Sequence, residues 1–170
     1  MPRVTVICPA YNRGSAIERT IQSVIRQSMT DWEMIVASDA SDDDTDEVVL
    51  RIAEREPRVR LIRTQRFGFP SGPCNIASRE ARSDVIAYIP HDDEWEPHHL
   101  EVLCGALDAG ADLAYTRARM VDPAGRFLWI SNALAQYWHP ELQVMSAMFE
   151  PARAAYRAKL VEEVGGWLES

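Results

Sequence analysis

The feature that most constrains the fold is a regular alternation of short apolar runs with amphipathic segments in the first third of the chain. Apolar runs at 4–7, 34–37 and 59–61 have the length of strands, whereas the segments between them repeat apolar residues at helical spacing. Near-continuous apolar strands joined by helices are typical of a parallel sheet that helices cover on both faces. We therefore expect an α/β fold with right-handed crossovers and a ligand site beyond the carboxyl ends of the strands.

Turn and cap residues mark where the elements begin and end. Ser15 to Glu18 matches a capping box for the first helix, and Asp44 is expected to cap the second. Further helices are predicted over 73–81, 97–110 and 151–164, and further strands over 85–89, 112–119 and 127–130, with a turn at 122–125.

The charge balance excludes several classes of partner. The chain has 26 Asp and Glu residues against 18 Lys and Arg residues and a formal net charge of -8, without a basic cluster. This argues against binding to nucleic acid or to an anionic membrane surface. No run approaches the roughly 20 apolar residues of a membrane-spanning helix. Cys8, Cys74 and Cys104 lack zinc-site spacing, which indicates buried thiols in a reducing compartment and predicts a cytoplasmic protein.

The loop after the first strand lacks the usual glycine-rich phosphate cradle. It reads Pro9-Ala10-Tyr11-Asn12-Arg13-Gly14, and the single lysine, Lys159, is far along the chain. A diphosphate bound at this sheet would therefore need a divalent metal ion held by carboxylates as its counter-charge.

Carboxylates follow two of the strands. Asp39 ends the second strand, where it can accept hydrogen bonds from a base or a ribose, while the other acids up to Glu47 are expected to be solvated or to cap a helix. Asp92 and Asp93 follow the fourth strand, and two adjacent carboxylates repel each other unless a cation or hydrogen bonds compensate. Hard oxygen ligands favour magnesium or manganese completed by substrate phosphates.

Three alternatives compete with this metal site. The acids from Asp92 to Glu96 can instead cap the helix that follows Pro97. The acidic run at 39–47 suggests a calcium loop but lacks the glycine and the final glutamate of an EF-hand. The three histidines His91, His98 and His99 offer a zinc-like set, although His98 and His99 fall in the first turn of a helix.

Taken together, these motifs resemble a known family. The residues that carry the resemblance are the opening strand with Pro9-Ala10-Tyr11, then Asp39-Ala40-Ser41, the segment from Gly68 to Ala77 with Asn75, the pair Asp92-Asp93, and Val164-Gly165-Gly166-Trp167. Their order and spacing resemble the nucleotide-sugar glycosyltransferases of family 2, which have the GT-A fold, a Rossmann-like, mostly parallel sheet with helices on both faces.

The resemblance implies roles for individual residues. Pro9, Ala10 and Tyr11 would line the nucleobase pocket, and Asp39 would accept from the base. Asp92 would face the donor ribose or phosphate, and Asp93 would hold Mn²⁺ or Mg²⁺. The implied reaction transfers a sugar with inversion from a UDP, GDP or dTDP sugar to the hydroxyl of a saccharide, lipid-linked or small-molecule acceptor.

The resemblance also implies how the chain is organised. Residues 1–170 would form one domain, with a nucleotide-sugar-binding half over about 1–110 and the start of an acceptor-side half over about 111–170. The family's general base lies in a Glu-Asp motif beyond the Gly-Gly-Phe segment, so we expect it outside this sequence, and the catalytic residue is unassigned. The chain is then a fragment of a longer enzyme or a catalytically silent sugar-nucleotide-binding module.

Two further expectations concern an alternative enzyme class and the residue that contacts the acceptor. A nucleotidyltransferase would need a glycine-rich loop and a basic residue after the first strand, where only Arg13 and Gly14 are present. For the acceptor, Trp138 is the predicted contact among several aromatic residues that are equally suited to a core, namely Trp129, Tyr137, Trp138, His139 and Trp167.

Overall fold

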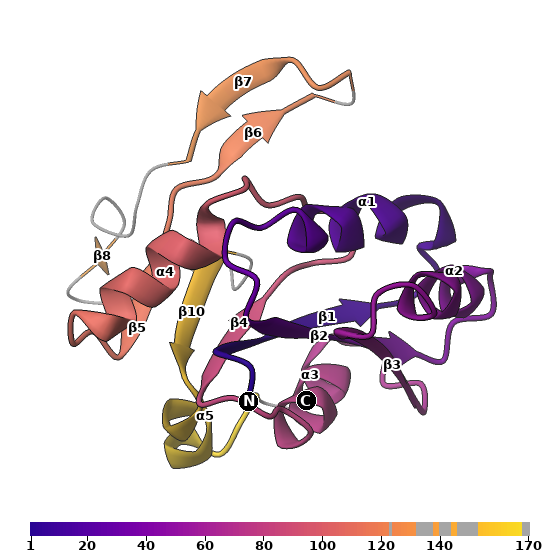
Figure 1. The fold of residues 1–170 in the computed structure, drawn as a ribbon, viewed down its shortest axis with the longest axis horizontal. Helices are drawn as coiled ribbons and strands as arrows, with labels where there is room; N and C mark the ends of the chain where they lie inside the picture. The colour runs from indigo at the N-terminus through magenta and orange to yellow at the C-terminus, as the bar shows by residue number, and fades with distance from the viewer. Residues whose placement is uncertain (123, 132–137, 140–143, 146–152, 168–170) are drawn as a thin grey trace.

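A six-stranded sheet forms the centre of the fold (Figure 1). The computed structural model describes residues 1–122, 124–131, 138–139, 144–145 and 153–167. The strands of the sheet follow the order β3-β2-β1-β4-β10-β5, with bounds Val59–Thr64, Trp32–Asp39, Val4–Ala10, Val85–Tyr88, Ala154–Arg157 and Leu113–Tyr115. β1 pairs in parallel with β2 and β4, and only β10 runs antiparallel to its two neighbours within this sheet.

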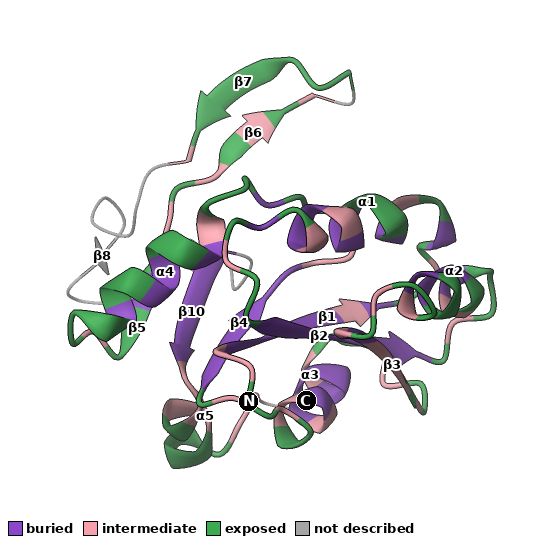
Figure 2. Cartoon of the chain, viewed as in Figure 1, coloured by how far each residue is buried: buried purple, intermediate pink, exposed green. Residues whose placement is uncertain are grey.

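Helices cover both faces of the sheet. One face packs against α1 (Gly14–Ile25), α2 (Thr45–Ala53) and α4 (His99–Asp108), and the other packs against α3 (Ser71–Arg79) and α5 (Ala158–Val164). All eight residues of β2 are buried, as a strand covered on both faces requires. Figure 2 shows that buried residues are concentrated in this sheet and on the helix faces turned toward it. The expected α/β architecture is thus confirmed.

The last part of the chain differs from the prediction. The predicted helix over 151–164 is wrong at residues 154–157, which form β10, and among the described residues of this segment only Ala158–Val164 are α-helical. Ala155 faces Ala87 of β4 on one side and Ala114 of β5 on the other, so small side chains allow the strand to be buried between them. The alanine-rich sequence favours a helix locally, and pairing with the two neighbouring strands overrides that preference.

The starts of α1 and α2 also differ from the prediction. α1 begins at Gly14 without a side-chain cap of its own, so the capping box at Ser15 is wrong. Asp44 occupies the N-cap position of α2, but its side chain makes no capping hydrogen bond. Instead, Asp43 accepts from the N–H of Thr45 at 2.9 Å and from the N–H of Gly14 at 3.0 Å. One carboxylate therefore serves the first turns of two helices.

A β-hairpin stands apart from the central sheet (Figure 1). Its strands are β6 (Arg119–Val121) and β7 (Phe127–Ile130), joined through a turn in which Gly125 donates to the carbonyl of Asp122 at 2.8 Å. The predicted strand over 112–119 is accordingly divided between β5 and β6. A short antiparallel pair, β8 (Trp138–His139) with β9 (Val144–Met145), follows. Within the described part of the chain, no helix combines the length and apolarity needed to cross a membrane.

Candidate functional site

A cleft of about 1290 Å³ opens at the carboxyl ends of β1, β2 and β4. This is the position at which parallel α/β sheets bind ligands. The predicted site residues from all three strand ends lie on its wall, namely Pro9, Ala10, Tyr11, Asp39, Asp92 and Asp93. The fold therefore brings together six residues that are spread over more than 80 positions of the sequence, and their individual roles remain predictions.

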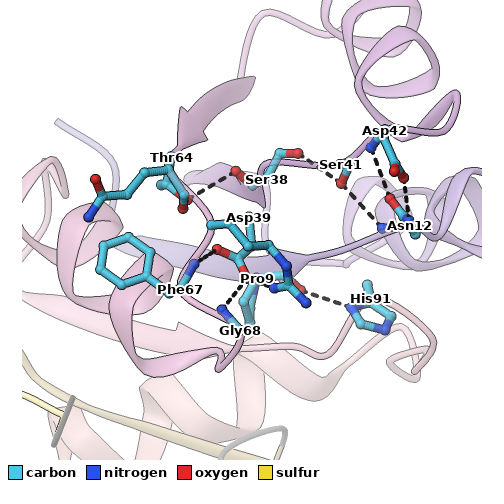
Figure 3. Close-up of polar contacts among 12 residues, drawn as sticks. Pro9, Asn12, Ser38, Asp39, Ser41, Asp42, Thr64, Phe67, Gly68 and His91 are labelled. Carbon is cyan, nitrogen blue, oxygen red and sulfur yellow. Dashed lines mark hydrogen bonds and ion pairs between the residues drawn. The ribbon is translucent and has the colours of Figure 1, made fainter. Parts of the chain in front are cut away.

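Asp39 organises the loop at one end of the cleft (Figure 3). Its Oδ1 accepts from the backbone N–H of Phe67 at 2.6 Å, and its Oδ2 accepts from that of Gly68 at 3.0 Å and from the guanidinium of Arg66. Gly68 adopts φ +84°, a left-handed conformation that glycine reaches without strain. The buried carboxylate thus fixes the 66–68 loop over the end of β2.

Arg66 connects Asp39 with Tyr11. The guanidinium of Arg66 lies 3.6 Å from the centroid of the Tyr11 ring, a cation–π distance, while it is paired with Asp39. The three side chains build one wall from β1, β2 and the 66–68 loop. Arg66 was missed in the sequence because it lies in a polar loop without any periodic signal.

The turn after β2 has a strained residue. Ala40 adopts φ +55°, which a residue with a Cβ rarely adopts. Next to it, the Asn12 side chain donates to and accepts from Asp42, and the backbone N–H of Asn12 donates to Ser41 Oγ at 3.2 Å. These bonds tie the loops after β1 and β2 together and hold the turn in its unfavourable conformation (Figure 3).

The Asp92-Asp93 loop is anchored on both sides by backbone contacts. His91 Nδ1 lies 3.1 Å from the carbonyl oxygen of Pro9, and Thr20 Oγ1 donates to the carbonyl of Asp93 at 2.8 Å. The backbone N–H of Trp95 donates to Ser23 Oγ at 3.1 Å. β1 and α1 therefore fix the position of the loop, and both aspartate side chains are exposed on the cleft wall.

The donor set suits a hard divalent cation bound together with a ligand. Two adjacent carboxylates on an open wall supply oxygen ligands and leave room for phosphate oxygens, as Mg²⁺ and Mn²⁺ require. Among the described residues, no group of three or more His, Cys, Asp or Glu side chains is gathered that could hold a metal ion without such a ligand. Neither the set of His91, His98 and His99 nor the acidic run at 39–47 forms such a group among the described residues.

His98 and His99 have other partners. His98, at the N-cap position of α4, has its Nδ1 3.1 Å from Oε2 of Glu101 in the first turn of that helix. The ring of His99 stacks on Trp95 with centroids 4.5 Å apart. Burial lowers the pKa of His99 to about 4, so its imidazole is neutral at pH 7 and adds no charge to the cleft.

The fold gathers positive charge that the sequence does not show as a cluster. Among the described residues, seven arginines line the cleft, namely Arg13, Arg19, Arg26, Arg66, Arg117, Arg119 and Arg153. Several lie near acids, such as Arg119 with Glu96 at 3.1 Å. Arg153 is buried and donates to Ser131 Oγ at 2.6 Å. Because these arginines come from four separate segments, no local pattern in the sequence predicts their convergence.

Trp167 lies on the cleft wall at the end of β4. Trp129, a second aromatic candidate, is on the exposed hairpin. Tyr137 lies outside the described residues, and so do the side chains of Trp138 and His139. The predicted contact of Trp138 with an acceptor therefore stays a prediction.

The three cysteines are free and buried, as expected. Burial raises the pKa of Cys74 to about 12, and burial together with nearby negative charge raises that of Cys8. Both thiols are therefore protonated at neutral pH and are poor nucleophiles.

Comparison with known proteins gives a family match over almost the whole chain. The family model described as Glycosyl transferase family 2 matches residues 5–164. Chondroitin synthase from Escherichia coli is 32% identical over 150 residues, which cover 87% of this chain and 21% of that protein. The putative teichuronic acid biosynthesis glycosyltransferase TuaG from Bacillus subtilis is 32% identical over 100 residues, covering 59% of this chain and 40% of that protein.

Solved structures share the fold. The TarS fragment 1–349 from S. aureus in complex with UDP superposes with a TM-score of 0.81 at 18% identity, covering 98% of this chain and 50% of that one. The mannosyltransferase PcManGT from Pyrobaculum calidifontis, in complex with GDP-Man and Mn²⁺, has a TM-score of 0.70 at 26% identity over 99% of this chain and 48% of that one. The chain thus spans half or less of each of these relatives.

Proposed function

Since this chain belongs to glycosyl transferase family 2, we propose that it binds a nucleoside-diphosphate sugar with a divalent cation and transfers the sugar, with inversion, to an acceptor hydroxyl. One observation carries the proposal: residues from three strand ends that match the family's motifs converge on one cleft. The donor is a UDP, GDP or dTDP sugar, and the acceptor is a saccharide, a lipid-linked or a small molecule. The complexes of the two structural relatives with UDP and with GDP-Man and Mn²⁺ support this class of donor.

The nucleoside would bind at the end of the cleft formed by β1 and β2. Pro9, Ala10 and the Tyr11 ring offer it a surface, and the Asp39 carboxylate is the acceptor predicted to face the base. Because Arg66 lies against both Tyr11 and Asp39, a base that reaches this wall meets a cation as well as a carboxylate.

The diphosphate would bind next to the loop after β4. Asp93 would hold Mn²⁺ or Mg²⁺, and Asp92 would face the ribose or a phosphate. When bound, the cation acts as a Lewis acid that stabilises the negative charge developing on the leaving diphosphate. The acidic loop needs this cation, since Asp92 and Asp93 would otherwise repel an anionic ligand. The role of Asp93 is then to place positive charge next to the diphosphate, where the bond between the sugar and the phosphate breaks.

Asp93→Asn tests the proposal most directly. It removes the charged ligand but preserves the shape of the side chain, so the Mn²⁺-dependent affinity for UDP or GDP should fall by at least about tenfold. Isothermal titration calorimetry with and without Mn²⁺ measures this difference. Glu94→Gln is the matched control, because it neutralises a neighbouring acid that contacts Arg19 and Arg26 at 3.9 Å, and it should leave the affinity within about twofold.

Two outcomes would contradict the assignment. An Asp93→Asn variant that keeps its full Mn²⁺-dependent affinity shows that the metal is held elsewhere. A wild-type chain that binds none of UDP, GDP, dTDP and their sugars with Mn²⁺ removes the donor class altogether. Wild-type binding without transfer to any acceptor, when the chain is assayed within its full native polypeptide, would favour the silent binding module over the enzyme.

A further inference from the structure

Trp167 is held on the cleft wall by three hydrogen bonds. Its backbone N–H donates to Asn75 Oδ1 at 2.8 Å, and its carbonyl accepts from Asn75 Nδ2 at 2.9 Å. Its indole Nε1–H donates to the hydroxyl of Tyr88 at 2.9 Å. Asn75 belongs to α3 and is buried, so an element of the predicted donor half fixes a residue 92 positions later in the chain.

Gly166 allows this close approach. It adopts φ +85°, and a Cβ on it would lie 2.8 Å from Asn75 Oδ1, closer than side chains pack. The Gly-Gly-Trp segment therefore fits against Asn75 in a way that any larger residue at 166 would prevent.

The hydrogen bonds from Asn75 and Tyr88, together called the Trp167 clamp, determine which surface of the indole faces the cleft. The indole ring meets the Tyr88 ring edge-on, with centroids 5.4 Å apart and an angle of 84°, and its only polar atom is bound to Tyr88. The indole surface left for the cleft is therefore carbon. Trp167 packs against a buried apolar cluster that includes Cys74 and Tyr88, and it is itself only partly buried. It is therefore the member of this cluster that presents apolar surface to a cleft otherwise rich in charged side chains.

The order of strands indicates what this patch would meet. Along the sheet, Asp39 ends β2, Tyr11 directly follows β1, and Asp92 and Asp93 lie in the loop after β4. The next strand beside β4 is β10. Tyr88 ends β4 and contacts Tyr156 of β10, with ring centroids 5.7 Å apart. A nucleoside diphosphate sugar extends as base, ribose, diphosphate and sugar. With its base at β1–β2 and its diphosphate at β4, its sugar reaches the side of β4 where Trp167 lies.

We propose that Trp167 packs the carbon face of its indole against a pyranose ring and that Asn75 is the positioning residue that holds the indole in place. The order of the strands along the sheet assigns this ring to the donor sugar. Aromatic carbon suits the C–H face of a sugar ring because both surfaces leave water on contact. The inference rests on the proposed function for the placement of base and diphosphate, but the clamp itself does not.

The proposal is tested by the sugar increment, which is the ratio of the affinity for a sugar nucleotide to the affinity for the same nucleotide without the sugar. In wild-type protein, UDP-GlcNAc or GDP-mannose should bind more tightly than UDP or GDP in the presence of Mn²⁺. Trp167→Ala should reduce this ratio by about fivefold, while the affinity for the bare nucleotide stays within about twofold. Trp167→Phe keeps a ring and should restore most of the ratio. Asn75→Asp keeps the acceptor for the backbone N–H of Trp167 but loses the donor to its carbonyl, so it should lower the ratio. The melting temperature of this variant is measured as well, to show that it is folded.

An NMR titration keeps the proposal testable apart from the proposed function. The Trp167 indole N–H resonance, assigned by its loss in Trp167→Phe, should shift with sugar nucleotides more than with the bare nucleotides. If the ring belongs to an acceptor, free N-acetylglucosamine, mannose or glucose should shift it without any nucleotide. No shift with any of these probes, or an unchanged sugar increment in folded Trp167→Ala with no shift from the free sugars, overturns the proposal. Failure of nucleotides alone to bind counts against the proposed function only.

Discussion

Glu33 is a buried acid at the end of the sheet opposite to the cleft. It lies near the start of β2, where its Oε1 accepts from Thr5 Oγ1 at 2.8 Å and from the backbone N–H of Arg82 at 2.7 Å. Its Oε2 lies 3.4 Å from Arg60 Nε. One carboxylate thereby joins β1, β2, β3 and the segment before β4.

We expect Glu33→Gln to lower the free energy of unfolding by about 2 kcal/mol. The amide keeps one acceptor for Thr5 and Arg82, but its NH₂ group would face the guanidinium of Arg60, and the substitution removes the buried carboxylate that lies 3.4 Å from Arg60 Nε. Urea unfolding followed by circular dichroism measures the change.

Glu80→Gln serves as the control for this prediction. Glu80 also approaches Arg60, at 3.9 Å, but its side chain is 60% exposed, and such pairs contribute less than about 1 kcal/mol. Equal losses for the two variants would mean that the burial of Glu33 does not matter.

The candidate site shows which residues a sequence can predict. Asp39, Asp92 and Asp93 were predictable because each lies within a few residues of the end of an apolar run, and the carboxyl ends of parallel strands share one edge. Arg66 and Trp167 were not assigned a place on the wall, since their positions depend on contacts with Asp39 and Asn75 that form only in three dimensions.

At the scale of elements, Asp43 couples the first turns of α1 and α2. Although burial opposes it, hydrogen bonds from Thr45 and Gly14 lower the pKa of Asp43. The carboxylate form is therefore the one that stabilises the folded chain, and its contribution is present above the unfolded pKa and decreases as the pH falls through the folded pKa.

Asp43→Ala should destabilise the fold by about 1 kcal/mol at pH 7, because it removes acceptors from two helix starts. Thermal unfolding at pH 7 measures the effect. Asp44→Ala is the neighbouring control, since Asp44 makes no side-chain capping bond, and it should change stability by less than about 0.5 kcal/mol. If Asp44→Ala lost more stability than Asp43→Ala, the result would support Asp44 as the helix cap, as expected from the sequence.

The elements that sequence reasoning predicted well are those with strong local patterns. β1, α1, β2, α2 and β3 follow from apolar periodicity, which reports the side of each element that packs on the sheet. β10 does not, because Ala154 to Arg157 have a helix-favouring composition and become a strand only between β4 and β5. Local patterns thus predict the parallel strands β1, β2 and β3, whereas the antiparallel strand β10 depends on pairing with strands that are distant in the sequence.

At the scale of the whole molecule, the sheet with its helices and the β6–β7 hairpin differ in how they are stabilised. The sheet buries its side chains on both faces, whereas the hairpin exposes four consecutive large apolar residues, Phe127 to Ile130 (Figure 2). An isolated two-stranded hairpin is marginally stable in water. We therefore expect the hairpin to open without unfolding of the sheet.

Native-state hydrogen exchange tests this independence. Amides of β1 and β2 should exchange through global unfolding, and those of β6 and β7 should exchange through local opening with a much smaller free energy. Glu33→Gln sharpens the comparison, because it should accelerate exchange in β1 and β2 by the factor that corresponds to its loss of stability and leave the hairpin rates unchanged. If β6 and β7 amides were as protected as those of β1 and slowed or accelerated with them, the hairpin would belong to the same cooperative unit as the sheet.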